Sequence, residues 1–130
     1  MTYLNHLGNK VPETHYLYYR DTFLSECQSL VNEHMLQYSW ESILTVSKGR
    51  RYDKIVSSDD HTKVEYWSQH STGSRRVWGF IDKNNGNILK AESWSKPAKH
   101  SRGNIYESDR MQFMSVYGPA YMDTIKKYYT

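Results

Sequence analysis

Basic and aromatic side chains gather in one short stretch of this sequence, where together they can bind an anion. Lysine offers a mobile point charge, whereas arginine offers a planar fork that matches phosphate or carboxylate oxygens. A tryptophan beside them can stack on a nucleobase, a contact worth about 1–3 kcal/mol in proteins that bind single strands. Glu92 is the only acid in the stretch. Its basic and aromatic members are Lys90, Trp94, Lys96, Lys99 and Arg102.

Two neighbouring residues extend this candidate ligand site. Asn104 follows Gly103, and a glycine lets backbone N–H groups approach a ligand without a Cβ in the way. His100 lies close to Arg102 and can contact the same ligand or act as a neutral acid or base, although no carboxylate nearby in the sequence could orient its ring. Alternatives stay open, because Trp94 can be a core residue, the lysines can be merely solvated, and Arg102 can anchor the segment by pairing with a carboxylate.

A second basic group precedes the first along the chain, and its position relative to the first decides which ligand fits. An extended nucleic acid needs a basic stripe that continues across several elements. A nucleotide needs a closed pocket in which tryptophan or tyrosine and one or two arginines converge. A protein-docking surface needs an exposed aromatic patch with a basic rim. Because side chains alternate along a strand, the sequence does not show which face of the sheet the second group occupies. Its members are Arg50, Arg51, Lys54, Arg75 and Arg76.

Metal-binding and catalytic patterns are weak throughout the sequence. The six histidines show no metal-ligand spacing, and the single cysteine, Cys27, has no paired ligand. The cluster Asp59-Asp60-His61 has metal-binding residue types, but it is more typical of a turn between strands. Cys27 lies on an apolar stripe, which favours a core thiol over a nucleophile. We therefore expect no catalytic residue, no metal and no cofactor.

The elements that position these residues begin with a long helix. From Pro12 to about Tyr38, apolar or aromatic residues recur every seven positions, at Leu17, Leu24 and Val31 and at Tyr38 itself. Pro12 suits the first turn of a helix. The stripe is wide enough to pack on a sheet or against a second copy of itself, so core packing and a homo-oligomer through this helix both stay open.

Period-two patterns and turn residues place the rest of the chain in a sheet. Val77 to Ile81 and Asn87 to Trp94 predict a β-hairpin around Asn84-Asn85-Gly86, where the turn requires positive φ. Pro97 interrupts any regular element between 93 and 103, so we expect a loop there that leaves the hairpin. The remaining expected elements are a short helix from Ser39 to Val46, strands from Arg51 to Ser57 and from Lys63 to His70, and a short helix from Asp109 to Tyr117 stopped by Gly118-Pro119.

Together these patterns predict an α+β fold, in which the long N-terminal helix packs on a roughly four-stranded antiparallel sheet and a short C-terminal helix follows. We expect one domain, residues 1–130, with a core rich in aromatic side chains. The net charge of +3 is too small to make general nucleic-acid binding the default, but the acids concentrate in the N-terminal third, so the molecule should be electrically polarised. No apolar run reaches the ~18 residues of a membrane span and one cysteine cannot form an intramolecular disulfide, so we expect a soluble protein of a reducing cytoplasm with no membrane partner.

The most specific motif of the chain is W-x-x-P-A-K-x-x-R-G-N, residues 94–104, and shorter stretches accompany it at 49–56, 73–77, 80–82, 105–106 and 117–121. In these stretches the chain resembles a family of small uncharacterised bacteriophage proteins. The resemblance implies a viral origin, and hence the cytoplasm of the infected bacterial host as the location, but it brings no established chemistry. The first 48 residues fall outside it.

The function that we expect is that of a small non-enzymatic phage accessory protein, which binds an anionic ligand, nucleic acid or nucleotide, through its basic aromatic loop. The alternative is an inhibitor of a bacterial defence system, which either sequesters a nucleotide signal or docks on a host protein.

Overall fold

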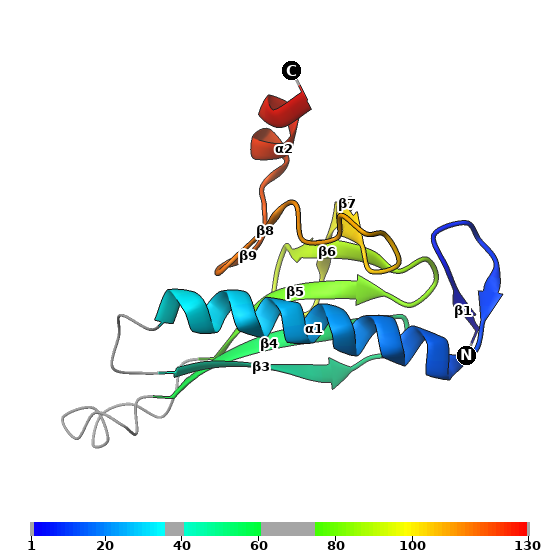
Figure 1. Ribbon diagram of the computed structural model, residues 1–130, viewed down its shortest axis with the longest axis horizontal. Coiled ribbons are helices and arrows are strands. Elements are labelled where there is room, and N and C mark those ends of the chain that lie inside the picture. Colours follow the sequence, from blue (N-terminus) through cyan, green and yellow to red (C-terminus); the bar gives the residue numbers. More distant parts are fainter. Residues whose placement is uncertain (1, 36–40, 61–74, 130) are drawn as a thin grey trace.

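A long helix lying across an antiparallel sheet forms the centre of the computed structural model, which describes residues 2–35, 41–60 and 75–129 (Figure 1). The helix is α1 (Glu13–Met35), and the sheet has the strand order β3-β4-β5-β6-β7, so every strand pairs with its neighbour in sequence. The expected α+β class is confirmed, although the main sheet has five strands rather than about four. These strands are β3 (Glu41–Lys48), β4 (Tyr52–Asp60), β5 (Arg75–Asp82), β6 (Asn87–Ala91) and β7 (Pro97–Asn104).

The apolar face of α1 packs on the sheet. Tyr16, Phe23, Cys27 and Val31 are almost completely buried and belong to one core cluster with residues of β3 to β6. The heptad position Leu24 lies beside this face and is only partly buried, because the buried spacing follows the helical period of about 3.6 residues and not a strict heptad. Core packing therefore occupies the apolar face, and a homo-oligomer seam would have to use another side of the helix.

The short helix expected from Ser39 to Val46 is wrong, because Glu41–Lys48 is strand β3. Burial alternates along it, with Ser42 and Leu44 buried and Ile43 exposed, which is the period of a strand. Gln28 of α1 fixes this edge strand, since its Oε1 accepts a hydrogen bond from the Leu44 amide at 2.8 Å and its Nε2 donates to the Ser42 carbonyl at 2.8 Å. The strand expected from Lys63 to His70 lies outside the described residues.

The hairpin prediction is confirmed by β5 and β6, which pair around a turn closed by the Gly86 amide and the Asp82 carbonyl at 2.7 Å. Gly86 has φ +81°, the left-handed conformation that the turn requires. The loop expected over 93–103 is wrong in its second half, because β7 begins at Pro97. A proline is tolerated there because it stands at the first residue of an edge strand, where no ladder amide is needed.

The C-terminal part differs most from expectation. The helix expected from Asp109 to Tyr117 is replaced by turns and a small hairpin, while a helix forms later in the chain. Gly118, with φ +117°, makes the reversal possible, because a side chain there would clash with the Trp78 carbonyl. The elements outside the main sheet are β1 (Tyr3–Leu4), β2 (Lys10–Val11), β8 (Met114–Ser115), β9 (Gly118–Pro119) and α2 (Met122–Tyr129).

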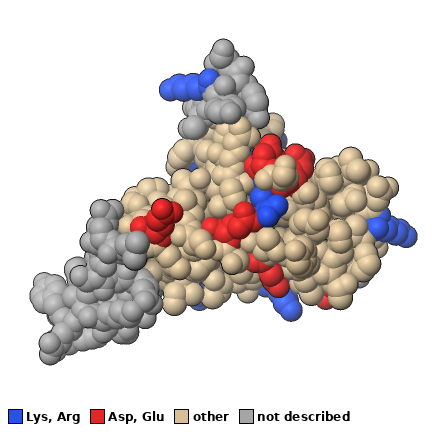
Figure 2. Space-filling view, viewed as in Figure 1, with Lys and Arg blue, Asp and Glu red and all other residues tan. Residues whose placement is uncertain are grey.

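The face of the molecule covered by α1 is acidic. Figure 2 shows acidic side chains gathered over the helix and the segment beside it, with basic side chains sparser among them. Within the described ranges, no helix combines the length and apolarity that a membrane crossing requires.

A cationic aromatic pocket as candidate functional site

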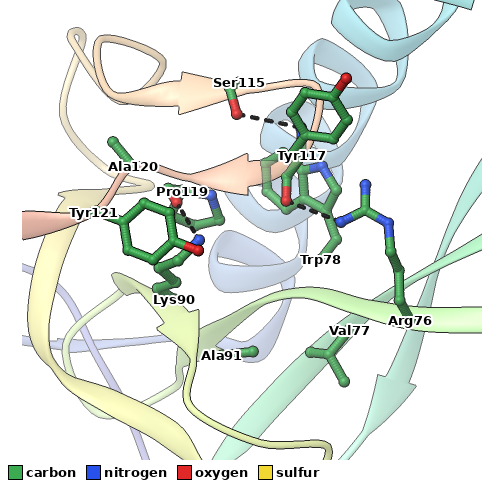
Figure 3. A pocket seen from close by; sticks show the side chains of 10 residues that line it. All are labelled: Arg76, Val77, Trp78, Lys90, Ala91, Ser115, Tyr117, Pro119, Ala120 and Tyr121. Carbon is green, nitrogen blue, oxygen red and sulfur yellow. Dashed lines mark hydrogen bonds between the residues drawn. The ribbon is translucent and has the colours of Figure 1, made fainter. Parts of the chain in front are cut away.

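A cavity of about 570 Å³ lies between the ends of β5 and β6 and the β8–β9 hairpin (Figure 3). Its lining includes the basic side chains of Arg76, on β5, and Lys90, on β6. Tyr117, in the turn between β8 and β9, and Tyr121, just after β9, supply aromatic rings. Each cation faces one of the tyrosines, so the pocket contains two cation–tyrosine pairs.

The first pair joins Arg76 to the hairpin turn. Its guanidinium donates from Nη1 to the Tyr117 carbonyl at 3.1 Å and from Nη2 to the Val116 carbonyl at 3.4 Å. The guanidinium carbon also lies 5.7 Å from the centre of the Tyr117 ring. Trp78 contacts the same turn, since its Nε1 donates to the Val116 carbonyl at 3.3 Å. The turn is thus held by two strand β5 residues whose side chains reach it from the sheet.

The second pair joins Lys90 to the end of β9. Its Nζ donates to the Pro119 carbonyl at 3.0 Å and lies 4.1 Å from the centre of the Tyr121 ring. Burial lowers the pKa of Lys90 below its usual 10.5, and the positive charges of Arg102 and Arg76 lower it further. A cation in this environment gains from the arrival of an anion, because the anion supplies the opposite charge that the pocket lacks.

Arg102 stands behind the pocket and holds its wall. The side chain is only 7% exposed, and its Nε donates to the Ala120 carbonyl at 3.2 Å. Its Nη1 donates to the His100 carbonyl. Burial lowers the pKa of Arg102 as well. The carboxylate pair weighed in the sequence is not among its contacts in the described chain, so Arg102 anchors the segment through carbonyl oxygens instead.

All three cations converge on one short segment of backbone, residues 116–121. Arg76, Lys90 and Arg102 donate to its carbonyl oxygens, and none has a carboxylate within ion-pair distance among the side chains that the structure describes, which leave out Glu41, Asp59, Asp60 and Asp123. Carbonyl oxygens satisfy hydrogen bonds but carry no net charge, so the positive potential around the segment is not cancelled. The arrangement can hold an anion, and the two tyrosine rings can hold an aromatic group beside it.

A second cation–aromatic group lies at Trp94, in the loop between β6 and β7. Its side chain is 50% exposed. Lys54 Nζ lies 4.5 Å from the ring centre, and the guanidinium carbon of Arg75 lies 5.8 Å from it. Lys54 and Arg75 also have no carboxylate partner among the side chains that the structure describes, to which those of Asp59 and Asp60 do not belong. We call Trp94, Lys54 and Arg75 the tryptophan platform.

The remaining residues of the predicted site do not join either group. Lys96 pairs with Glu92 at 3.3 Å on the surface, and Lys99 and His100 are exposed along β7. Asn104 is buried and structural, because its Nδ2 donates to the Asn85 carbonyl at 2.7 Å and to Asn87 Oδ1 at 3.0 Å.

In the second basic group, Arg51 pairs with Asp82 at 3.1 Å, and Arg50 is exposed between β3 and β4. Sequence reasoning thus named Arg76 and Lys90 but missed their aromatic partners Tyr117 and Tyr121. The signal that could have found the tyrosines is their place in the 117–121 stretch, where the family resemblance ends.

The described ranges contain no cluster of three or more His, Cys, Asp or Glu side chains that could hold a metal ion. Cys27 is fully buried, and burial strongly raises the pKa of its thiol. Its Sγ lies 3.9 Å from the Met111 sulfur. The expectation of a core thiol agrees with this environment.

Fold and site together describe a small α+β protein with a cationic, tyrosine-lined pocket beside a β-hairpin. The chain belongs to a family described as "Family of unknown function (DUF7717)", which it matches over residues 9–118. The matched range includes Arg76, Lys90 and Tyr117 and stops short of Tyr121. No curated protein and no solved structure matches the chain significantly.

Proposed function

We propose that this is a small non-enzymatic phage accessory protein that binds the phosphate and base of a nucleotide, either free or within a nucleic acid. The observation that carries the proposal is the pocket in which Arg76 and Lys90 each face an exposed tyrosine ring without a carboxylate partner in the described chain. The cations suit phosphate oxygens, and the rings suit a base. The phage origin rests on the family resemblance alone.

The size and polarity of the pocket support a ligand of this kind. Its volume of about 570 Å³ falls within the range of small-molecule sites, which is about 300–1,000 Å³. Trp78 and Val77 give it an apolar part, while the two cations supply the few polar groups that fix orientation. An anion that lacked an aromatic group would use only half of these contacts.

Binding rather than catalysis is favoured by the chemistry of the lining. Arg76 and Lys90 are hydrogen-bond donors, and the Ser115 hydroxyl already donates to the Gly118 carbonyl at 2.9 Å. Nucleophilic catalysis requires a nucleophile with a base in hydrogen-bond reach, whereas the Ser115 hydroxyl bonds to the Gly118 carbonyl and the Tyr117 amide and Lys90 Nζ bonds to the Pro119 carbonyl. The pocket is therefore suited to holding a nucleotide unchanged.

Inhibition of a bacterial defence system is the second candidate. Tyr117 and Tyr121 are 65% and 69% exposed, and exposed aromatic rings with cations at their rim are typical of protein-docking surfaces as well. In this form the protein would sequester a nucleotide signal or cover a host protein with the same surface.

Calorimetric titration tests the proposed function. ADP should bind the wild-type protein, while adenosine and inorganic phosphate should each bind at least about tenfold more weakly, a difference of about 1.4 kcal/mol. Lys90→Met should weaken ADP binding at least about tenfold, since it removes the charge but keeps an apolar chain of similar length. Tyr121→Ala should weaken binding and Tyr121→Phe should preserve it, because stacking needs only the ring.

The matched control for these variants is Lys10→Met, which removes an exposed lysine on β2, outside the pocket lining. It should leave ADP binding unchanged. If ADP and a range of other mononucleotides and oligonucleotides all fail to bind the wild type at high micromolar concentration, the proposal is wrong and protein docking becomes the leading candidate.

A further inference from the structure

The pocket and the tryptophan platform lie at the same end of the strand pair β5–β6. Phe80 pairs with Leu89 in this antiparallel ladder, so the first residues of β5 lie beside the end of β6. Arg75 and Arg76 are the first two residues of β5, and Lys90 and Ala91 are the last two of β6. The two cation–aromatic groups therefore both lie at this end of the strand pair, one on each side of it.

Strand alternation sends the two neighbouring arginines to different groups. Successive residues of a strand point to opposite faces of the sheet. Arg75 accordingly reaches the Trp94 ring, while Arg76 reaches the Tyr117 ring. The backbone at this point is thus flanked by positive charge on both faces, and each side also offers an aromatic ring.

We infer that the ligand is a single-stranded nucleic acid that passes around this strand end, with one base in the pocket and a neighbouring base on Trp94. The inference rests on the proposed function and specifies the ligand class of the same site. Lys90 and Arg76 contact phosphates on the pocket side, and Arg75 and Lys54 contact phosphates on the platform side. Stacking platforms combined with a basic path along the backbone are how proteins bind single strands without reading sequence.

A duplex does not fit this geometry. Its bases are stacked inside the double helix, so they are not free to lie on protein rings. Duplex DNA is also stiff, with a persistence length of about 50 nm, and cannot bend around the end of one strand pair. A single nucleotide fits the pocket but leaves the platform unused.

The cations of the two groups differ from several other basic residues of the protein, which are paired with acids. Arg20 pairs with Asp53 at 3.3 Å, and Lys83 and Arg110 also pair with carboxylates. Lys54, Arg75, Arg76 and Lys90 have no such partner among the described side chains, which do not include those of Glu41, Asp59, Asp60 and Asp123. A polyanion that covers both sides would neutralise all four.

The test compares thymidine monophosphate with single-stranded thymidine oligonucleotides of two, four and eight residues, by calorimetry and fluorescence anisotropy. Affinity should rise at least tenfold between the mononucleotide and the four-residue strand. Trp94→Ala should abolish this gain and leave mononucleotide binding unchanged. Arg75→Met should reduce the slope of log affinity against log salt concentration by about 0.7, the share of one phosphate contact on a single strand. Lys10→Met should change neither quantity.

Several outcomes would overturn the inference. If the four-residue strand binds no more tightly than the mononucleotide, or if a duplex of the same length binds as tightly as the single strand, single-strand binding is wrong while nucleotide binding stands. If Trp94→Ala weakens mononucleotide and oligonucleotide binding equally, the platform is not a separate contact. If neither ligand binds the wild type, the proposed function itself fails. Circular dichroism of the Trp94→Ala and Arg75→Met variants verifies that both are folded.

Discussion

Buried charge is satisfied in opposite ways in two regions of this molecule. Beneath α1, the fully buried Asp53 carboxylate accepts a hydrogen bond from Tyr16 at 2.7 Å and pairs with Arg20 at 3.3 Å. Lys83 Nζ lies 3.4 Å from its other oxygen, an ion-pair distance without hydrogen-bond geometry, and also donates to the Gly49 carbonyl at 2.7 Å. Beside the β8–β9 hairpin, Lys90 and Arg102 have carbonyl oxygens and no opposite charge in the described chain.

The difference separates a structural charge cluster from a ligand-binding one. Asp53, on β4, contacts α1 through Arg20 and the β5–β6 turn through Lys83. Its negative charge compensates the positive charges of both side chains. The cations of the pocket hold the backbone of residues 116–121 in place but keep their positive potential. Substitutions in the first region should therefore alter stability, whereas substitutions in the second should alter binding.

Asp53→Asn should have the largest effect on stability. It leaves the buried Lys83 without a countercharge and Arg20 with only its surface partner Asp21, and breaking a buried ion pair in this way costs about 3–5 kcal/mol. For a chain of this size the melting temperature should fall by about 10–20 °C. Thermal unfolding followed by circular dichroism measures the change. The control is Asp21→Asn, which removes the surface partner of Arg20 and should cost about 0–1 kcal/mol. Equal melting temperatures for both variants would contradict the structural role of Asp53.

Gly118→Ala should have an intermediate effect that reaches both stability and binding. The residue has φ +117°, and a Cβ there would clash with the Trp78 carbonyl, so the hairpin that carries Tyr117 must shift. A cost of about 1–3 kcal/mol is typical of such backbone strain. Gly8→Ala is the control, because Gly8 also has a positive φ, +81°, but open space around it. Chemical denaturation should give a larger loss for Gly118, and calorimetry should show weaker ADP binding for Gly118→Ala alone.

Lys90→Met should have the smallest effect on stability despite its large expected effect on binding. The lysine is partly desolvated and has no acid partner among the described side chains, so its removal should cost no more than about 0.5–1.5 kcal/mol, the contribution of its hydrogen bond to the Pro119 carbonyl. Chemical denaturation measures this quantity. A destabilisation comparable to that of Asp53→Asn would mean that Lys90 is part of the structural framework.

The pH dependence gives a finer test of Lys90. Its pKa is lowered in the folded protein, so between that value and the unfolded value of about 10.5 the unfolded chain holds more protons. Lys90 therefore makes the free energy of unfolding increase slightly as the pH rises through this window. Anion binding should fall over the same rise in pH, because the lysine loses its charge. Lys90→Arg should abolish the fall in ADP affinity, which calorimetry at several alkaline pH values would detect.

Local patterns predicted the elements that depend on local chemistry. The turn at Asn84-Asn85-Gly86 and the helical period of α1 were both visible in the sequence, because positive φ and amphipathic spacing are properties of neighbouring residues. Strand β3 was mistaken for a helix, since Ser39 resembles an N-cap and nothing local shows that Gln28 pins the strand. Register shifts in the β6–β7 ladder likewise hide the periodicity of β7.

The site was predictable in part for the same reason. The sequence identified Arg76, Lys90 and Trp94 as members of basic or aromatic groups, but not which of them meet. Tyr117 reaches Arg76 across 41 positions of the chain, and no local pattern reports such a contact. Arg102 and Asn104 were predicted to touch a ligand, yet their side chains hold backbone carbonyls and the hairpin turn.

Nuclear magnetic resonance of protein labelled in its tyrosine rings tests the central claim most directly, because it locates the ligand without any substitution. During titration with ADP, the ring resonances of Tyr117 and Tyr121 should show the largest changes in chemical shift. The rings of Tyr3 and Tyr16, which stack 4.9 Å apart near the Asp53 cluster, should stay unchanged. Saturation without any change at Tyr117 and Tyr121, or larger changes at Tyr3 and Tyr16, would contradict a nucleotide site in the pocket.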